Sequence, residues 1–289
     1  MTAPSRVGEP SGLGWPGASV SRETRAARTA GAQTRVITVA NQKGGVGKTT
    51  TAVNLATALA EEGARVLVLD LDPQANASTA LGIAHPPGIP STYDVVVDGA
   101  ALAGVVQPTA IANLACAPAT ADLAGAEVEL VPVVGRELRV RDALSTYAEP
   151  LDYVFLDCPP ALGLLTINAL AAANELLVPI QAEYYALEGL GQLTATVELV
   201  RTRLNPQLAI SAILLTMYDG RTRLAEQVAD EVRRHFGATV LSTTIPRSVR
   251  TAEAPSYGQP VLTYDRSSSG ARAYVAAARE LHARQPVPS

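Results

Sequence analysis

A glycine-rich stretch between an apolar run and a helical pattern is the feature that most constrains how this chain can fold. The apolar run covers residues 36–40, the helical pattern ends at Gly63, and between them lies Asn41-Gln42-Lys43-Gly44-Gly45-Val46-Gly47-Lys48-Thr49-Thr50. Glycines let backbone N–H groups curve around an anion, and the N-terminus of a helix adds a favourable dipole. This order predicts a strand, a phosphate-binding loop (P-loop) and a helix.

The two lysines of this loop are the only lysines among the 23 Lys and Arg residues of the chain. The usual pattern G-x-x-x-x-G-K-[ST] predicts that Lys48 contacts the β- and γ-phosphates and that the Thr49 hydroxyl binds Mg²⁺. The same pattern calls for glycine at position 42, where this chain has Gln42, followed by Lys43. An ammonium is a compact point charge suited to a phosphate, whereas the guanidinium used elsewhere in the chain is a planar fork. We therefore expect both lysines to serve a nucleotide.

The composition indicates one large α/β domain, because 289 residues with 47% hydrophobic and 17% charged residues can bury a sizeable core. No run of 18 uncharged apolar residues is present, so no transmembrane helix is expected. Residues 1–32 lack the apolar core of a signal peptide. The two cysteines, Cys116 and Cys158, suit a reducing compartment without a disulfide framework. These features predict a cytoplasmic protein.

Apolar runs and helical patterns alternate from Arg35 onward. After the first strand and helix 48–62, we expect strands at 65–70, 113–117, 152–157, 175–180, 208–216 and 239–245, and helices at 136–147, 162–173, 186–203, 222–235 and 268–284. Residues 84–110 are rich in Pro and Gly and are expected to form loop with short helical pieces. This order predicts a single P-loop NTPase domain of the α/β class over residues 35–284, with a mostly parallel twisted sheet and helices on both faces.

The two ends of the chain lie outside this pattern. Residues 1–34 are rich in Gly, Pro, Ser, Ala and Arg without an apolar period, and we expect a disordered extension there and a disordered tail at 285–289. The extension is either a solvated segment or a weak arm that binds DNA or a partner.

Two acids follow apolar runs that are typical of buried parallel strands. Asp157 ends the run that begins at Tyr153 and has the form of a Walker B carboxylate, which holds Mg²⁺, usually through water. Asp72 follows the run at 65–70 in the sequence Asp70-Leu71-Asp72-Pro73-Gln74. Because the carboxyl ends of parallel strands face the ligand crevice, we expect both acids near the loop.

The loop resembles the deviant Walker A motif of the ParA/MinD group of P-loop ATPases. Three later stretches resemble the ParA/Soj chromosome-partitioning ATPases within that group, so the resemblance spans residues 35–284. They are Val178-Pro179-Ile180-Gln181-Ala182-Glu183-Tyr184-Tyr185-Ala186-Leu187-Glu188-Gly189-Leu190, Thr216-Met217-Tyr218-Asp219-Gly220-Arg221-Thr222, and Ile245-Pro246-Arg247-Ser248-Val249-Arg250-Thr251-Ala252-Glu253-Ala254-Pro255-Ser256-Tyr257-Gly258.

The resemblance implies specific roles at the nucleotide. Lys43 would reach across a nucleotide-sandwich dimer to the partner's phosphates. Asp72 would orient the attacking water near the γ-phosphate and Mg²⁺, with Thr49 and Asp157 serving the metal. The nucleotide would be bound by Lys43, Gly44, Gly45, Val46, Gly47, Lys48, Thr49 and Thr50, with Met217, Pro246 and Arg247 bordering the adenine. Lys43, Lys48 and Asp72 would then carry a slow, partner-stimulated hydrolysis of ATP to ADP and phosphate.

The resemblance also implies partners. An ATP-bound homodimer would bind double-stranded DNA without sequence preference, through a surface that includes Arg221 and Arg250. A ParB-type protein would be the second partner, and the protein would segregate chromosomes or plasmids in association with the nucleoid.

The charge distribution is compatible with DNA binding, although the net charge of −4 is not. Residues 1–35 carry five Arg against two acids, and residues 201–289 carry twelve Arg against seven acids. The remainder is strongly acidic, which indicates a basic face on an acidic body.

Other classes of protein fit the sequence less well. A MinD-like, membrane-associated ATPase, the main alternative, would end in a basic amphipathic helix with bulky apolar residues, but the segment at 271–281 is rich in alanine. An iron–sulfur reductase would need two cysteines at the dimer axis, whereas Cys116 and Cys158 have the character of small buried hydrophobic residues. A metabolic ligase does not explain residues 245–258, and residues 1–34 are too short for an operator-binding domain. Because the segment at 271–281 does not have the character of a membrane-binding helix, we expect no membrane partner.

Overall fold

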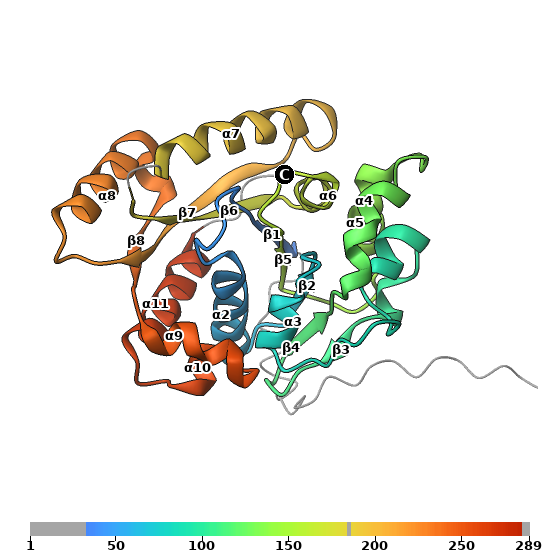
Figure 1. Cartoon of the computed structure of the whole chain (residues 1–289), viewed down its shortest axis with the longest axis horizontal. Helices are drawn as coiled ribbons and strands as arrows, with labels where there is room; N and C mark the ends of the chain where they lie inside the picture. The colour runs from blue at the N-terminus through green and yellow to red at the C-terminus, as the bar shows by residue number, and fades with distance from the viewer. Residues whose placement is uncertain (1–32, 184–185, 285–289) are drawn as a thin grey trace, which may run out of the picture.

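The apolar run at the start of the predicted domain forms the middle of the sheet. The computed structural model describes residues 33–183 and 186–284, and Figure 1 shows their arrangement. Eight strands form one sheet in the order β3-β4-β2-β5-β1-β6-β7-β8. Their bounds are β1 Arg35–Val39, β2 Val66–Asp70, β3 Gln107–Pro108, β4 Leu114–Ala117, β5 Tyr153–Asp157, β6 Glu175–Gln181, β7 Ala209–Tyr218 and β8 Val240–Pro246. Of these strands only the short edge strand β3 runs antiparallel to its neighbour.

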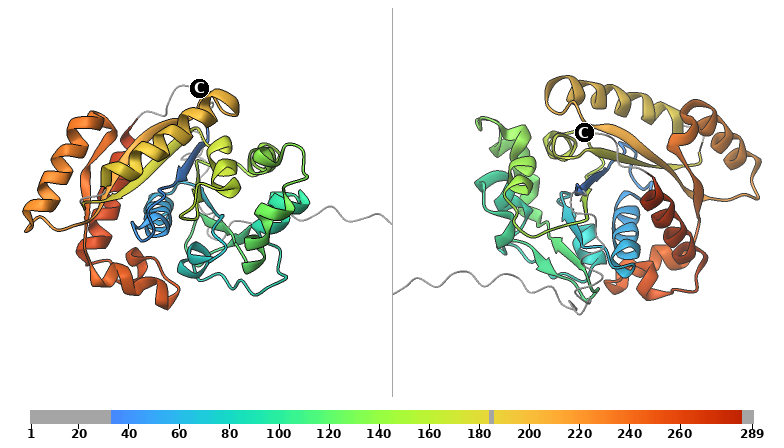
Figure 2. Two further views of the ribbon diagram at one scale, coloured as in Figure 1. Left: turned by 45° about the horizontal axis from the view of Figure 1, so that its top comes forward. Right: turned by 180° about the vertical axis from the view of Figure 1, so that it is seen from behind.

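Helices cover both faces of the sheet, as predicted (Figures 1 and 2). One face is covered by α2 (Lys48–Glu61), α3 (Asn76–Ala80), α10 (Val261–Tyr264) and α11 (Ser269–Ala283). The other is covered by α5 (Arg139–Ser145), α6 (Leu164–Ala172), α7 (Ala186–Arg203) and α8 (Arg223–Phe236). Successive residues of β2 point into opposite cores: Val66 and Val68 pack with α2, whereas Leu67 and Leu69 pack on the other side. A sheet buried on both faces explains why its strands have continuous apolar runs.

The remaining elements are short. They are α4 (Ala126–Glu129), α9 (Val249–Glu253), and the single turns η1 (Asp94–Asp98), η2 (Leu102–Gly104), η3 (Ala121–Gly125), η4 (Arg136–Leu138), η5 (Gly237–Thr239) and η6 (Ala254–Tyr257). The predicted loop at 84–110 contains η1, η2 and β3, and the predicted helix at 136–147 is divided into η4 and α5. The predicted extension is described only at residues 33 and 34, and the tail at 285–289 lies outside the described residues.

A buried ion pair joins β1 to β6 at the amino-terminal ends of these strands, opposite the P-loop, and its arginine also contacts the last helix. Arg35 donates to both carboxylate oxygens of Glu175 at 2.6 and 2.7 Å, and its third nitrogen donates to the carbonyl of Leu281 at 2.8 Å. The guanidinium lies 5.5 Å from the centroid of the Tyr153 ring, whose hydroxyl is 2.6 Å from Nδ1 of His282. Because these contacts fix the end of α11 against β1 and β5, the apolar face of α11 is committed to the fold.

Candidate nucleotide-binding site

The strand register brings the loop and the predicted acids to one edge of the sheet. Val39, the last residue of β1, is paired with Asp157 of β5, and Asp157 is paired on its other side with Asp70 of β2. The segment that leaves β1 here is the predicted phosphate-binding loop. Parallel strands therefore deliver it and both acidic segments to the same crevice, as expected for their carboxyl ends.

The loop conformation depends on two glycines. Gly45 has φ +74° and Gly47 has φ +86°, and a Cβ added at either would meet no heavy atom within 4 Å. Glycine is therefore required here because the backbone is left-handed, and not because a side chain would lack space. No side chain caps the start of α2 after Gly47, so its first amides face the loop, ready for an anion. The Thr216 hydroxyl on β7, two strands away from β1 in the sheet, donates to the carbonyl of Val46 at 2.8 Å and holds the loop.

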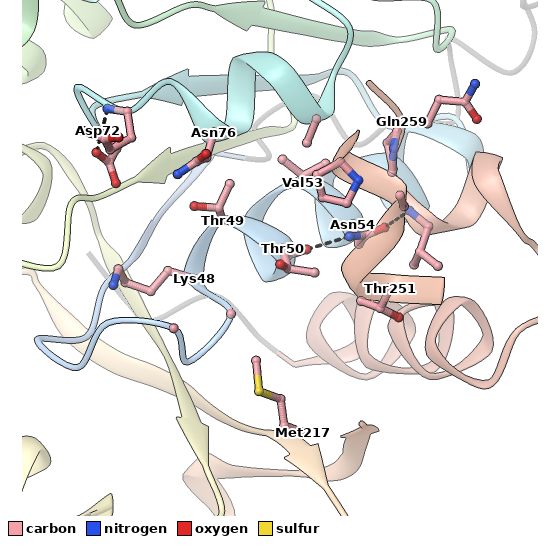
Figure 3. Close-up of a pocket in the computed structure, with 18 of the residues that line it drawn as sticks. Lys48, Thr49, Thr50, Val53, Asn54, Asp72, Asn76, Met217, Thr251 and Gln259 are labelled. Atoms are coloured by element: carbon pink, nitrogen blue, oxygen red, sulfur yellow. Dashed lines mark hydrogen bonds between the residues drawn. The ribbon is translucent and has the colours of Figure 1, made fainter. Parts of the chain in front are cut away.

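A cavity of about 390 Å³ opens beside this loop (Figure 3). The residues that line it and that the sequence predicted are Gly44, Gly45, Gly47, Lys48, Thr49, Thr50, Asp72 and Met217. The predicted residues outside its lining are Lys43, Val46, Asp157, Pro246 and Arg247. The cavity thus joins the P-loop to one of the two acids, and the remaining predicted residues lie around it.

Lys48 is the ammonium group that lines this cavity. It is buried, and its Nζ lies 3.4 Å from the carbonyl of Lys43. Burial lowers the pKa of the Lys48 ammonium, while the carboxylates of Asp157 and Asp72 act in the opposite direction. Figure 3 shows Lys48 and Thr49 at the start of α2, with Asp72 on the side of α3. A cation held in this way is poised to neutralise an anion inside the cavity.

Asp157 is buried and has no hydrogen-bond partner for either carboxylate oxygen among the described residues. Burial raises its pKa well above the usual range, and the nearby Asp70 raises it further, while Thr49 and Lys48 favour the charged form. A buried carboxylate without a partner fits a bound cation. A threonine hydroxyl and carboxylates form the oxygen donor set that Mg²⁺ prefers. Among the described residues, no group of three or more His, Cys, Asp or Glu is placed to hold a metal ion.

Asp70 has a structural role. Its carboxylate accepts from both the amide and the hydroxyl of Ser78 at 2.8 Å, and from the amide of Asp72 at 3.1 Å. Burial raises its pKa to about 6, and these hydrogen bonds oppose that shift. Asp70 thereby holds α3 and the turn before it. Asp72, whose Oδ1 accepts from the amide of Gln74 at 2.9 Å, is the acid left at the cavity.

One wall of the cavity was not predicted. It comes from α9, η6 and the start of α10, and consists of Thr251, Ala254, Pro255, Gln259, Pro260 and Val261. Asn54 of α2 joins this wall to the P-loop helix: its amide donates to the carbonyl of Thr50 at 2.8 Å and its Oδ1 accepts from the amide of Val261 at 2.8 Å. No sequence pattern marked Asn54, because the residues three and four positions from it are Thr50, Thr51, Thr57 and Ala58, which form a largely polar face of the helix.

The residues predicted to border the adenine lie at the ends of β7 and β8. Met217 has φ +50° and lines the cavity. Its neighbour Tyr218 is paired with Pro246, and the amide of Arg247 donates to the carbonyl of Tyr218 at 3.3 Å. Pro246 and Arg247 are therefore held next to Met217 without lining the cavity, and their contact with adenine stays a prediction.

Lys43 is not among the residues that line the cavity. Its Nζ lies 2.8 Å from Oε2 of Glu183, in the loop after β6. Its amide donates to the side chain of Asn41 at 3.0 Å. The two lysines of the loop thus lie in different places: Lys48 lines the cavity and Lys43 lies outside its lining.

The two arginines predicted to contact DNA are exposed and paired with acids. The side chain of Arg221 is 90% exposed and makes two hydrogen bonds of 2.8 Å to Asp219, which lower the pKa of that carboxyl to about 2. Arg250 lies 3.3 Å from Glu253 and 3.6 Å from Asp265. Exposed pairs of this kind contribute little to stability, and contact of these arginines with DNA stays a prediction.

Comparison with known proteins identifies the family. A family model described as an AAA domain matches residues 34–210. The chain is 51% identical over 249 residues to the sporulation initiation inhibitor protein Soj of Bacillus subtilis, covering 86% of this chain and 98% of that protein. The chain belongs to the ParA/Soj family of chromosome-partitioning ATPases. The chromosome partitioning protein ParA of Myxococcus xanthus is also 51% identical, over 86% of this chain and 87% of its own.

Solved structures place the ParA/Soj fold within a wider group. The cobyrinic acid a,c-diamide synthase of Mycobacterium smegmatis, solved with ADP and magnesium, is 37% identical with a TM-score of 0.76, covering 89% of this chain and 99% of that one. The septum site-determining protein MinD of Pyrococcus horikoshii, complexed with Mg-ADP, is 25% identical with a TM-score of 0.71, covering 87% and 97%. The prediction of an α/β P-loop domain of the ParA/MinD type is confirmed. The lower identity of both structures supports the partitioning family over a ligase or a MinD.

Among the residues that the structure describes, no helix combines the length and apolar character needed to cross a membrane.

Proposed function

We propose that this chain is a DNA-segregation ATPase that forms a homodimer when it binds ATP and Mg²⁺. The dimer binds double-stranded DNA without sequence preference and releases it after slow hydrolysis, which a ParB-type partner stimulates; the protein acts in the cytoplasm on the nucleoid. The observation that carries the proposal is the different placement of the two lysines of the loop. Lys48 lines the cavity, whereas Lys43 is outside its lining, is 36% exposed and pairs with Glu183, so it is accessible to a second subunit.

Within one subunit, each described group would have a distinct task. Bound ATP and Mg²⁺ would supply the γ-phosphoryl group and the charge that neutralises it. The α2 amides and Lys48 bind and orient the phosphates, and Thr49 with Asp157 offers oxygen ligands. Asp72, at the cavity, positions the attacking water. Positioning and charge neutralisation are most of what phosphoryl transfer requires.

Asp72→Ala is expected to separate assembly from hydrolysis. The carboxylate that positions water is lost, while Lys48 and the α2 amides that bind the phosphates remain. Turnover should fall by about 100-fold or more, since positioned acid–base groups contribute roughly 10²–10⁴-fold. Phosphate release would measure the rate, and the variant should accumulate as an ATP-bound dimer on DNA. Wild-type turnover in this variant would move the role elsewhere, with Asp157 the next candidate.

DNA binding would depend on the dimer. An acidic monomer presents few arginines to a duplex, and a few phosphate contacts give weak, salt-sensitive binding. Pairing two subunits doubles the contacts on one surface, so ATP can gate DNA binding by geometry. Phosphate contacts carry no sequence information, which is why the base sequence should hardly matter.

Arg221→Glu and Arg250→Glu are each expected to abolish DNA retention in moderate salt while ATP-dependent dimerisation persists. Each dimer loses two phosphate contacts and gains two repulsive ones. Co-sedimentation with unrelated duplexes would measure retention in ATP, in ADP and without nucleotide. Arg279→Glu is the matched control, because Arg279 is also exposed and paired with an acid, Glu62, but lies on α11. Full retention by both test variants would overturn the assigned surface, leaving the arginines of residues 1–34 as the next place to look.

The membrane-associated, MinD-like alternative is disfavoured by the packing of α11. Ala271, Tyr274, Ala277, Ala278 and Leu281 on this helix are all buried against the fold. The apolar face that an interfacial helix would insert into lipid is therefore already used. A liposome arm in the same co-sedimentation experiment would test this, with no ATP-dependent binding expected.

A further inference from the structure

The Glu183 carboxylate, which pairs with Lys43, is itself held by Gln181, the last residue of β6. Oε2 of Glu183 lies 2.8 Å from Nζ of Lys43, and the other oxygen, Oε1, accepts from the side-chain amide of Gln181. The Glu183 amide donates to the carbonyl of Gln181 at 2.8 Å, closing a tight turn at the end of β6. Both the backbone and the side chain of Glu183 are thus positioned before any second subunit is present.

The same strand also positions the backbone of Lys43. The Asn41 side chain donates to the carbonyl of Pro179 on β6 at 2.7 Å and accepts from the amide of Lys43 at 3.0 Å. Lys43 is therefore attached at two points, to β6 through Asn41 and to the loop after β6 through Glu183. Both hold it on the rim of the loop, outside the cavity that Lys48 lines.

We propose that Glu183 is a positioning residue that keeps Lys43 out of its own cavity and competes with the second subunit's phosphates for it. The inference rests on the proposed function, in which Lys43 acts across an ATP-bound dimer. In the single subunit the ammonium is paired with a carboxylate. On dimerisation it exchanges that carboxylate for phosphate, and this happens once in each subunit. Glu183 thereby sets the protein concentration at which ATP drives assembly.

The size of this effect follows from the exposure of the ion pair. The side chains of Lys43 and Glu183 are 36% and 46% exposed, so the pair is close to a surface salt bridge. Such a pair corresponds to a change of about 1.4- to 5-fold in an equilibrium constant. Because a dimer exchanges two pairs, removing the Glu183 charge should tighten dimerisation by about 2- to 25-fold.

The first test is the dimerisation constant of Glu183→Gln, which removes the charge and keeps the shape. Sedimentation equilibrium with a non-hydrolysable ATP analogue and Mg²⁺ should show tighter assembly than wild type. Glu198→Gln is the matched control, because Glu198 is an exposed acid on α7 that pairs with Arg201 instead. The control should assemble like wild type. Equal or weaker assembly of Glu183→Gln would overturn the proposal.

The second test uses the presence of only two lysines in the chain. An amine-reactive reagent, followed by mass spectrometry of the peptides, would report Lys43 and Lys48 separately in the nucleotide-free protein. Glu183→Gln should label faster than wild type at Lys43, because the ion pair no longer restricts the ammonium. Labelling of the buried Lys48 should not change, whereas a general loosening of the loop would raise both rates.

The two tests distinguish failure of this inference from failure of the proposed function. A wild-type protein that stays monomeric with the analogue would overturn the proposed dimer and the competition with it. A wild-type dimer together with unchanged Lys43 labelling in Glu183→Gln would overturn only the role of Glu183.

Discussion

Lys48→Ala is expected to abolish stable ATP binding. Lys48 is buried and is the ammonium that lines the cavity, so the β- and γ-phosphates would lose their nearest counter-charge. Removing one partner of a desolvated charge pair costs about 3–5 kcal/mol, which corresponds to a loss of affinity of roughly 100-fold or more. Titration calorimetry with ATP and Mg²⁺ would measure it.

The control for this prediction is Lys43→Ala, which removes the other lysine of the same loop. Because Lys43 does not line the cavity of its own subunit, this variant should keep measurable ATP binding. The thermal midpoint of Lys43→Ala should stay near that of wild type, since Lys43 is partly exposed and lies outside the apolar core. Near-normal ATP affinity in Lys48→Ala would show that the cavity is not the phosphate site.

The sequence predicted the central sheet well, because its strands are buried on both faces. Continuous apolar runs such as 153–157 leave little choice other than a parallel strand, and the glycine-rich loop fixed where the first strand ends. Long helices such as α7 and α11 also matched their predicted bounds within about one residue. The strands and the long helices could both be predicted because each has a pattern that is visible within its own segment of the sequence.

The unpredicted parts depend on contacts between distant segments. The helices α3, α9 and α10 each have four or five residues, which is too short for an apolar period to be recognised. Helix α3 is preceded by Ala75, with φ +53°, and is held by Asp70, so its position is a tertiary effect. The cavity wall formed by α9, η6 and α10 could not be predicted for the same reason.

The acids that follow the predicted strands show the same limit of local sequence patterns. Asp70 and Asp72 are two residues apart in one acidic segment, and the sequence does not say which of them faces a ligand. The structure separates them, because Ser78 occupies the Asp70 carboxylate and leaves Asp72 at the cavity. For Asp157, the position at the end of an apolar run predicted a metal ligand, and its buried carboxylate, which has no hydrogen-bond partner among the residues that the structure describes, supports that role.

Lys43→Ala is expected to block ATP-dependent dimerisation and turnover while leaving nucleotide binding in place. In the proposed dimer each Lys43 neutralises phosphates of the other subunit, so a dimer without it would bring two nucleotides together with less positive charge between them. Losing two charge-assisted contacts of about 1.5–3 kcal/mol each would weaken assembly by roughly 100-fold or more. The same loss in the transition state should reduce phosphate release to background.

The most direct measurement is the light-scattering mass of wild type and Lys43→Ala, each with saturating ATP and Mg²⁺. Wild type should have twice the mass of the 30.0 kDa chain with ATP and the mass of one chain with ADP. Lys43→Ala should have the mass of one chain with either nucleotide, although it still binds ATP. A dimer of Lys43→Ala as stable as that of wild type, or a wild-type monomer with ATP, would contradict the central claim that ATP joins two subunits through this lysine.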